Sequence, residues 1–201
     1  LRPLELAEKL RSEDGTEKFL FRLADGRLIE TVLIPSGGRR TLCLSTQVGC
    51  KFACVFCASG AGGFERYLLP SEMRGQVLYL RDRLEVQLTN FVFMGMGEPL
   101  DNLDNLVRAV RIMNAREGMN IAARRITIST VGIVPAIEKL EDLGLQVTLS
   151  LSLHATTDEL RSRLLPANRK YPLAEVIKAG ARYARTTGRM VTIEYILISG
   201  L

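Results

Sequence analysis

Long apolar runs are missing from this sequence. The longest, FVFMGM at 91–96 and IEYILI at 193–198, have the length of β-strands. Both are far shorter than the roughly 20 apolar residues that a membrane-spanning helix needs. No basic-then-apolar leader opens the chain, so we expect no secretory signal. Membrane and secreted proteins are therefore disfavoured, and we expect a cytoplasmic protein whose thiols stay reduced.

Histidine and cysteine are scarce, with one histidine, His154, and four cysteines among 201 residues. Three of the cysteines, Cys50, Cys54 and Cys57, fall within the eight-residue stretch CKFACVFC. In a reducing compartment, such a group usually binds a metal or carries out chemistry. A structural zinc site normally has four ligands, and only Cys43 and His154 remain as candidates for the fourth.

Three thiolates in one short loop can also hold three irons of a [4Fe–4S] cluster. The fourth iron then has no protein ligand and is free to bind a small molecule. The spacing of the cysteines by itself leaves both sites open, the closed zinc site and the iron–sulfur cluster.

Acidic residues are outnumbered, with 22 against 27 lysines and arginines, which gives a net charge of +5. Such an excess suits a polyanionic partner such as RNA, although a basic surface without that role is an equally open interpretation. The sequence has no aromatic-rich run of the kind that stacks RNA bases. Any affinity for RNA should therefore depend on charge and shape.

The first forty residues predict a small N-terminal segment. Residues 1–15 read as a short helix that ends in a turn. Residues 18–23 and 28–34 then predict a β-hairpin, because Asp25-Gly26 tolerates the positive φ of a tight turn. The stretch PSGGRR at 35–40 predicts a mobile basic loop.

From Thr41 onward, predicted strands and helices alternate, which is typical of βαβ units with a parallel sheet. We expect an α/β fold with a boundary between 1–40 and 41–201. A partial (β/α) barrel with its site at the carboxyl ends of the strands fits best, and an open doubly wound sheet is the alternative. The last predicted strand has no covering helix, so the chain looks cut short there. The predicted strands are 41–48, 90–96, 124–131, 146–154 and 190–200, and the predicted helices are 70–81, 101–118, 135–144 and 172–188.

The cysteine stretch, with Phe56 just before its last cysteine, resembles the signature of radical S-adenosylmethionine (SAM) enzymes. Five motifs in order resemble those of the RNA adenine C2-methyltransferases, which methylate adenosine in 23S rRNA and in some tRNAs. The resemblance runs from about residue 19 to residue 201, and the motifs are TLCLSTQVGCKFACVFCASGAGGF, FMGMGEPLDN, ITISTVG, SLSLHA and LLPANRKYPLAEV.

This resemblance implies a radical SAM core truncated after its fifth strand. It also implies a [4Fe–4S] cluster on Cys50, Cys54 and Cys57, SAM as the second cofactor, and a monomer. The implied partners are 23S rRNA, tRNA and an electron donor such as flavodoxin or ferredoxin. The implied SAM contacts are Phe56, Gly97, Glu98, Ser129, Ser152, Leu153 and His154.

Two further residues acquire roles only through the resemblance. Cys43, otherwise a small buried residue, matches a cysteine that releases a covalent protein–RNA intermediate by forming a disulfide. Glu30, otherwise a solvated strand residue, lies thirteen residues before Cys43 and matches the proton acceptor, for which we expect a dry pocket.

The sequence departs from the family in one important respect. The family carries the transferred methyl group on a later cysteine, and no cysteine follows Cys57 here. Methyl transfer is therefore expected only of a longer parent chain. The alternatives are a relative that methylates adenine C8 and confers antibiotic resistance, and a zinc-stabilised RNA-binding module without catalysis. The residues GEP at 97–99 favour C2 over C8 by resemblance.

Overall fold

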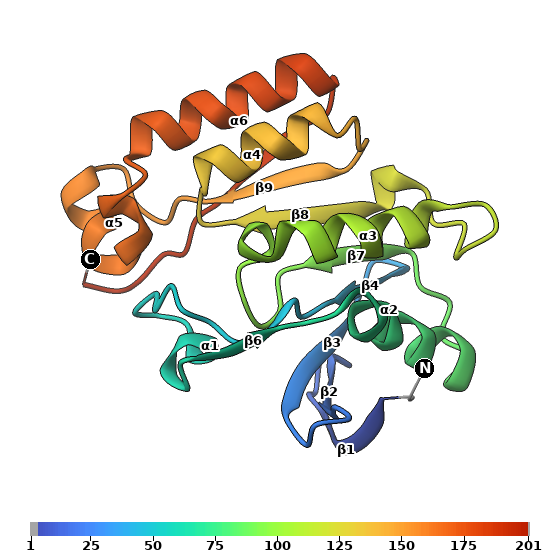
Figure 1. The fold of residues 1–201 in the computed structure, drawn as a ribbon. Helices are drawn as coiled ribbons and strands as arrows, with labels where there is room; N and C mark the ends of the chain where they lie inside the picture. The colour runs from blue at the N-terminus through green and yellow to red at the C-terminus, as the bar shows by residue number, and fades with distance from the viewer. Residues whose placement is uncertain (1–3, 201) are drawn as a thin grey trace.

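The computed structural model describes residues 4–200. One eight-stranded sheet extends through the molecule, in the order β1-β2-β3-β4-β7-β8-β9-β10 (Figure 1). Strands β1 to β4 pair antiparallel, and β4, β7, β8, β9 and β10 pair parallel. The strands are β1 (Glu5–Arg11), β2 (Glu17–Arg22), β3 (Leu28–Ser36), β4 (Arg39–Cys43), β7 (Asn90–Phe93), β8 (Ile126–Thr130), β9 (Thr148–Ser152) and β10 (Val191–Glu194).

The five parallel strands confirm the predicted α/β fold of partial-barrel type. They follow one another in chain order, without the reversal that defines a doubly wound sheet. The sheet stays open and does not close into a barrel. Four helices connect or cover these strands: α2 (Pro70–Leu78), α3 (Leu103–Asn114), α4 (Val134–Asp142) and α6 (Leu173–Thr187).

One face of the parallel sheet forms the core. Leu42, Phe91, Ile128 and Leu149 are buried and join one apolar cluster with side chains of these four helices. Their strand neighbours, such as Cys43, Val92 and Thr127, point to the opposite face and are only partly buried. A doubly wound sheet would be buried on both faces, so the one-sided burial also favours the barrel type.

The helix predicted for residues 1–15 is wrong for the residues that the structure describes, and residues 1–3 lie outside them. Residues 5–11 form β1, which pairs with β2. Lys9 Nζ lies 3.0 Å from Glu17 Oε1 on that neighbouring strand. A lone helix of this length is marginal in water, whereas strand pairing gives every second backbone group a partner in the sheet.

The loop predicted at 35–40 is a tight hairpin turn. β3 continues to Ser36 and β4 begins at Arg39, because Gly37 and Gly38 adopt φ angles of +53° and +78°. The expected domain boundary falls inside this hairpin, and a division there stays a prediction.

The strand predicted at 41–48 is divided in two. β4 ends at Cys43, and β5 (Gln47–Gly49) pairs with β6 (Phe64–Tyr67) in a separate two-stranded sheet. The cysteine stretch lies between β5 and β6, together with the short helix α1 (Ala58–Ala61). This small sheet anchors both ends of the cysteine loop.

Two elements near the C-terminal half were not predicted from the sequence. Helix α5 (Asp158–Leu164) begins after Thr157, whose Oγ1 accepts a hydrogen bond from Leu160 N at 3.3 Å. A 3₁₀ turn, Pro166–Arg169, follows it. Three further turns lie beside other elements: a π-turn Tyr79–Arg83 after α2, and 3₁₀ turns Pro99–Asn102 before α3 and Ala123–Arg125 before β8.

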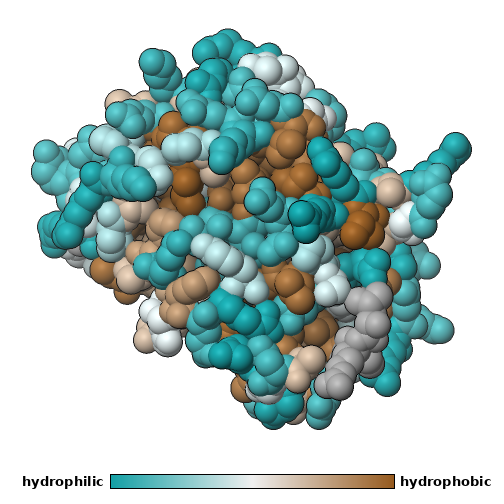
Figure 2. Space-filling model, viewed as in Figure 1, coloured by the Kyte–Doolittle hydropathy of each residue, from teal (hydrophilic) through white to brown (hydrophobic). Residues whose placement is uncertain are grey.

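Within residues 4–200, no helix is both long and apolar enough to span a membrane. On the face drawn in Figure 2, hydrophilic residues predominate, and hydrophobic residues show between them.

Candidate active site

A cleft of about 270 Å³ opens where the parallel strands end. The cysteine loop, the loop after β7 and the ends of β8, β9 and β10 all contribute to its walls. Most of the residues expected at the site line this cleft: Cys50, Cys54, Phe56, Cys57, Gly97, Glu98, Ser129, Ser152 and His154. Residues far apart in the sequence thus meet at the carboxyl edge of the sheet, which is the usual place of the active site in barrel-type folds.

The cysteine loop starts at a glycine that cannot be replaced without movement. Gly49 has a φ of +72°, and a Cβ built on it would overlap the carbonyl oxygen of Gly63. Cys50 N donates to that same oxygen at 2.9 Å. Further along, Val55 N donates to Leu164 O at 3.0 Å, which ties the loop to α5. The loop is therefore fixed at its start and in its middle.

The four cysteines are free thiols. Within residues 4–200, no three His, Cys, Asp or Glu side chains lie close enough together to hold a single metal ion. An iron–sulfur cluster places each thiolate on a different iron, so its three sulfurs need not converge on one point.

Glu98 is a buried carboxylate without a cationic partner. Its Oε1 accepts a hydrogen bond from Leu100 N at 3.1 Å, and its Oε2 accepts one from Val131 N at 2.9 Å. None of the ion pairs among residues 4–200 includes Glu98. Burial raises its pKa to about 7 despite these hydrogen bonds. A bound cation in the cleft would favour the ionised form.

Gln47 positions the loop that carries Glu98. Its Oε1 accepts a hydrogen bond from Glu98 N at 3.0 Å, and its Nε2 donates to Asp101 Oδ2 at 2.9 Å. Asp101 also pairs with Lys51 of the cysteine loop, at 2.6 Å. Gly97, with a φ of +99°, leaves room for the Gln47 side chain. Gln47 was not predicted from the sequence, where its only signal is a polar amide in an apolar strand just before Cys50.

His154 forms part of the wall in a strained turn. Its φ is +56°, its backbone N–H donates to Glu194 O at 3.3 Å, and its Nδ1 accepts a hydrogen bond from Ile196 N at 3.2 Å. The imidazole meets the ring of Phe56 edge-on, with 4.9 Å between centroids. Burial lowers the pKa of His154, so the ring is neutral at pH 7. His154 is both a structural residue and a wall of the cleft.

Glu194 was also missed. It lines the cleft from the end of β10, and its Oε1 accepts a hydrogen bond from Ser150 Oγ at 2.8 Å. Nearby, Ser129 Oγ and Ser152 Oγ lie 3.3 Å apart. The available signal was the acidic residue within the otherwise apolar strand sequence IEYILI.

Leu153, Glu30 and Cys43 do not line the cleft. Leu153 is buried beside it. Cys43 lies opposite Val32 of β3, so Glu30, two residues from Val32, faces the same side of the sheet as Cys43. Burial raises the pKa of the Cys43 thiol to about 11.

The dry pocket expected around Glu30 is wrong for the described residues. The Glu30 side chain is 40% exposed, and its Oε1 lies 2.9 Å from Lys18 Nζ. The reason is its position on β3 in the antiparallel part of the sheet, where Lys18 of β2 reaches its carboxylate. The proton-acceptor role of Glu30 stays a prediction.

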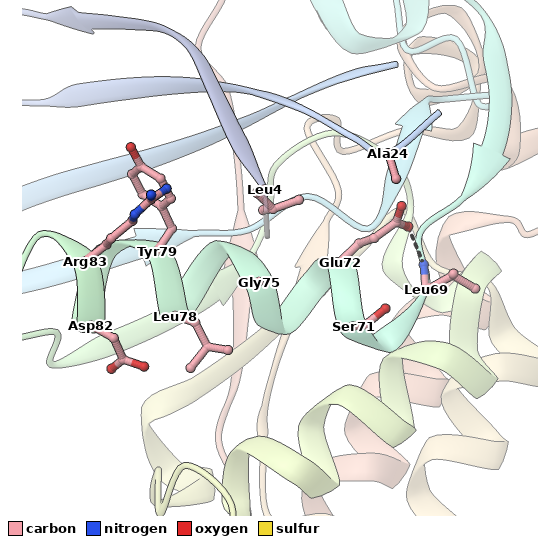
Figure 3. Close-up of a pocket in the computed structure, with 10 residues that line it drawn as sticks. All are labelled: Leu4, Ala24, Leu69, Ser71, Glu72, Gly75, Leu78, Tyr79, Asp82 and Arg83. Atoms are coloured by element: carbon pink, nitrogen blue, oxygen red, sulfur yellow. Dashed lines mark hydrogen bonds between the residues drawn. The ribbon is translucent and has the colours of Figure 1, made fainter. Parts of the chain in front are cut away.

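A second cavity, of about 510 Å³, lies between β1 and α2 (Figure 3). Leu4 projects onto α2 at Gly75, whose missing side chain makes room for it. Glu72 accepts a hydrogen bond from Leu69 N at 2.8 Å at one end. The cavity is largely apolar and contains none of the residues expected at the site. We therefore assign the functional site to the smaller cleft.

Comparisons with known proteins identify the family of the chain. The family model described as "Radical SAM superfamily" matches residues 44–201. A crystal structure of a radical SAM methyltransferase from Sphaerobacter thermophilus superposes with a TM-score of 0.95 at 50% identity. The match covers 100% of this chain and 60% of that one.

Curated sequences give the same family. The dual-specificity RNA methyltransferase RlmN of Geobacter sulfurreducens is 50% identical over 190 residues, which is 94% of this chain and 52% of the relative. A protein of Rhodopirellula baltica described as a probable dual-specificity RNA methyltransferase RlmN is 49% identical over 193 residues, 95% of this chain and 52% of the relative. The chain thus spans about half the length of these curated relatives.

The family model covers β7, β8, β9 and β10 and every residue that lines the cleft. The chain therefore belongs to the radical SAM superfamily, whose members use a [4Fe–4S] cluster and S-adenosylmethionine.

Proposed function

We propose that this chain is part of an enzyme that methylates C2 of adenosine in 23S rRNA and in tRNA. The observation that carries the proposal is the meeting of the three loop cysteines with Glu98 in one cleft. The names of the relatives support RNA as the substrate, and the net charge of +5 suits a polyanion.

The cysteine loop fits the cluster. Cys50, Cys54 and Cys57 project into the cleft from one short loop that is fixed at its start and in its middle. Three thiolates would hold three irons and leave one iron open to a second ligand in the same cleft. The Lys51–Asp101 pair connects this loop to the Glu98 loop. This ion pair fixes the position of the cysteine loop relative to the Glu98 loop.

The other wall fits SAM. The Glu98 carboxylate is buried and lacks a cation, and the ammonium of SAM would supply one. Gly97 allows the backbone to approach a ligand closely. The rings of Phe56 and His154 offer an apolar surface for an adenine, and the hydroxyls of Ser129 and Ser152 offer polar partners.

When bound, the cluster and SAM supply one-electron chemistry, which suits adenine C2 because that carbon is electron-poor and not nucleophilic. The residues of the chain bind and orient these groups and exclude water from the cleft. The methyl-carrying cysteine that the family uses has no counterpart after Cys57, so the complete reaction requires a longer chain.

Glu30 and Cys43 are the two proposed residues on the RNA side. A Glu30 carboxylate oxygen would accept the proton from adenine C2, which requires the ion pair with Lys18 to open. The Cys43 thiol is protonated at neutral pH, because burial raises its pKa to about 11. Its proton must leave before the sulfur can form a disulfide with the methyl-carrying cysteine of the longer chain. That step would break the carbon–sulfur bond to the RNA, and the carbon that leaves would take up a proton to complete the methyl group.

The same proposal includes a cytoplasmic location, a monomer, and an electron donor of the flavodoxin or ferredoxin class. The four free thiols are consistent with a reducing compartment.

Mass spectrometry of nucleosides from 23S rRNA and tRNA tests the proposal. RNA from cells with the intact gene is compared with RNA from cells whose gene carries C54A. We expect 2-methyladenosine to disappear in the variant. A loss of 8-methyladenosine would instead identify the C8-specific alternative, and unchanged modification would contradict both.

A further inference from the structure

Arg161 is fully buried on helix α5 and touches no carboxylate within hydrogen-bond distance. Buried arginines usually pair with an acid, because an uncompensated charge is costly to remove from water. Here the partners are uncharged oxygens. Nε donates to Leu153 O (3.2 Å), Nη1 to Asn168 Oδ1 (2.7 Å) and Tyr171 O (3.3 Å), and Nη2 to Val131 O (2.6 Å) and Ser152 O (3.1 Å).

Two of these oxygens belong to residues that line the cleft, Val131 and Ser152, and the oxygen of Leu153 belongs to the residue just before His154. Val131 follows β8, and its own backbone N–H donates to Glu98. Ser152 ends β9, and Leu153 follows it and leads directly into His154. One planar guanidinium therefore connects the segment that holds the Glu98 carboxylate to the segment that holds the imidazole.

The contact with Leu153 O has a further consequence for His154. The peptide that carries this oxygen precedes His154, whose φ of +56° is unusual for a residue other than glycine. Such a conformation persists only when its surroundings hold it. Arg161 holds the carbonyl side of this peptide, and Glu194 O accepts from its N–H side.

We infer that Arg161 is a positioning residue for SAM, which fixes the Val131 and His154 segments at the separation that the bound cofactor requires. This inference rests on the proposed cofactor site but not on RNA methylation. Lysine cannot replace arginine here, because one ammonium cannot reach acceptors that are spread across both segments and the turn after α5.

The test uses the full chain after anaerobic reconstitution, with SAM as the probe. R161K keeps the charge and loses the planar fork, and R161M removes both. R163K and R163M are the matched controls, because Arg163 lies on the same helix and is exposed. For each variant we measure iron and sulfide content, the urea midpoint and the dissociation constant for SAM.

We expect R161K to bind SAM at least about tenfold more weakly than R163K, a change of about 1.4 kcal/mol, with equal iron and sulfide content. Hydrogen exchange without SAM adds a local readout. The amides of Val131 and His154 should exchange faster in R161K than in R163K, while those of the β2–β3 hairpin stay unchanged.

Equal SAM affinity in R161K and R163K would overturn the inference. The inference would also be overturned if SAM binding by R161K and R161M fell only in proportion to the amount of folded protein, as judged from their urea midpoints. If RNA methylation were absent from the parent enzyme, SAM binding and its dependence on Arg161 would still be measurable. The two failures are thus distinguishable.

Discussion

The carboxylate of Glu98 and the backbone amide of Val131 lie in hydrogen-bond contact, with 2.9 Å between Oε2 and N. This contact joins the loop after β7 to the end of β8 inside the cleft. It partly compensates the burial of Glu98, yet it brings no positive charge. The site is therefore suited to a cationic ligand, and several predictions depend on this property.

The free energy of unfolding should depend on pH through Glu98. Burial raises the pKa of Glu98 to about 7 in the folded chain, from 4.5. Between these values the folded state binds more protons than the unfolded state, so stability falls as pH rises from about 4.5 to about 7. The contribution is on the order of 3 kcal/mol. Urea unfolding of the cofactor-free chain at pH 5 and pH 7.5 measures it, and E98Q should remove most of it. An equal pH dependence in E98Q would contradict this origin.

Loss of the Glu98 charge should weaken SAM binding. A glutamine can still accept a hydrogen bond, but it cannot form the charge-assisted one, which is worth about 1.5–3 kcal/mol. We expect E98Q to bind SAM about 10- to 100-fold more weakly, with unchanged iron content. E175Q is the matched control, because Glu175 is exposed on α6. Isothermal titration under anaerobic conditions gives both constants, and equal affinities would remove Glu98 from the site.

The loop cysteines and Cys43 should differ in their effect on the cluster. C50A, C54A and C57A each remove one proposed ligand, so reconstitution should leave little iron, sulfide or visible absorption. C43A should retain about four irons per chain, since Cys43 does not line the cleft. Iron and sulfide analysis with absorption spectra decides this. Full cluster content in C54A would show that Cys54 is not a ligand, and loss of the cluster in C43A would show that Cys43 is needed to hold it.

Gly49 should tolerate no side chain. An alanine there combines a φ of +72° with overlap onto the Gly63 carbonyl oxygen. G26A is the control, because Gly26 has a φ of +86° and open space around its would-be Cβ. We expect G26A to lower the free energy of unfolding by about 1 kcal/mol, because alanine is strained at this φ. G49A should lower it by about 1–3 kcal/mol more, because its Cβ is also overpacked.

The comparison is made by urea denaturation of the cofactor-free chains. Equal losses in G49A and G26A would show that the contact between Gly49 and Gly63 is not constrained.

Local patterns were sufficient to predict much of this fold. The alternation of strands and helices after Thr41 predicts the parallel sheet, and Gly188 correctly marks the end of α6 with a left-handed φ of +66°. The N-terminal helix was wrong because the leucines and charges of residues 4–11 are compatible with either state. Pairing with β2 decides between the two, and that is a tertiary contact.

The candidate site, too, could be predicted only in part from local sequence patterns. Cys50, Glu98 and His154 stand in recognisable motifs, so the sequence was enough to select them. Gln47 and Arg161 act through hydrogen bonds to residues in other segments, including Glu98 N and Val131 O. No local pattern reports such partners. The exposure of Glu30 likewise follows from where β3 lies in the sheet rather than from its neighbours in sequence.

We propose that the cysteine loop and the Glu98 wall bind an iron–sulfur cluster and SAM side by side. Electron paramagnetic resonance of the reconstituted, reduced chain, recorded with and without SAM, tests it most directly. We expect a cluster signal whose g-values shift when SAM is added to the native chain, and a much smaller shift in E98Q at the same SAM concentration. A signal that SAM leaves unchanged in the native chain, or stoichiometric zinc in place of iron, would contradict it.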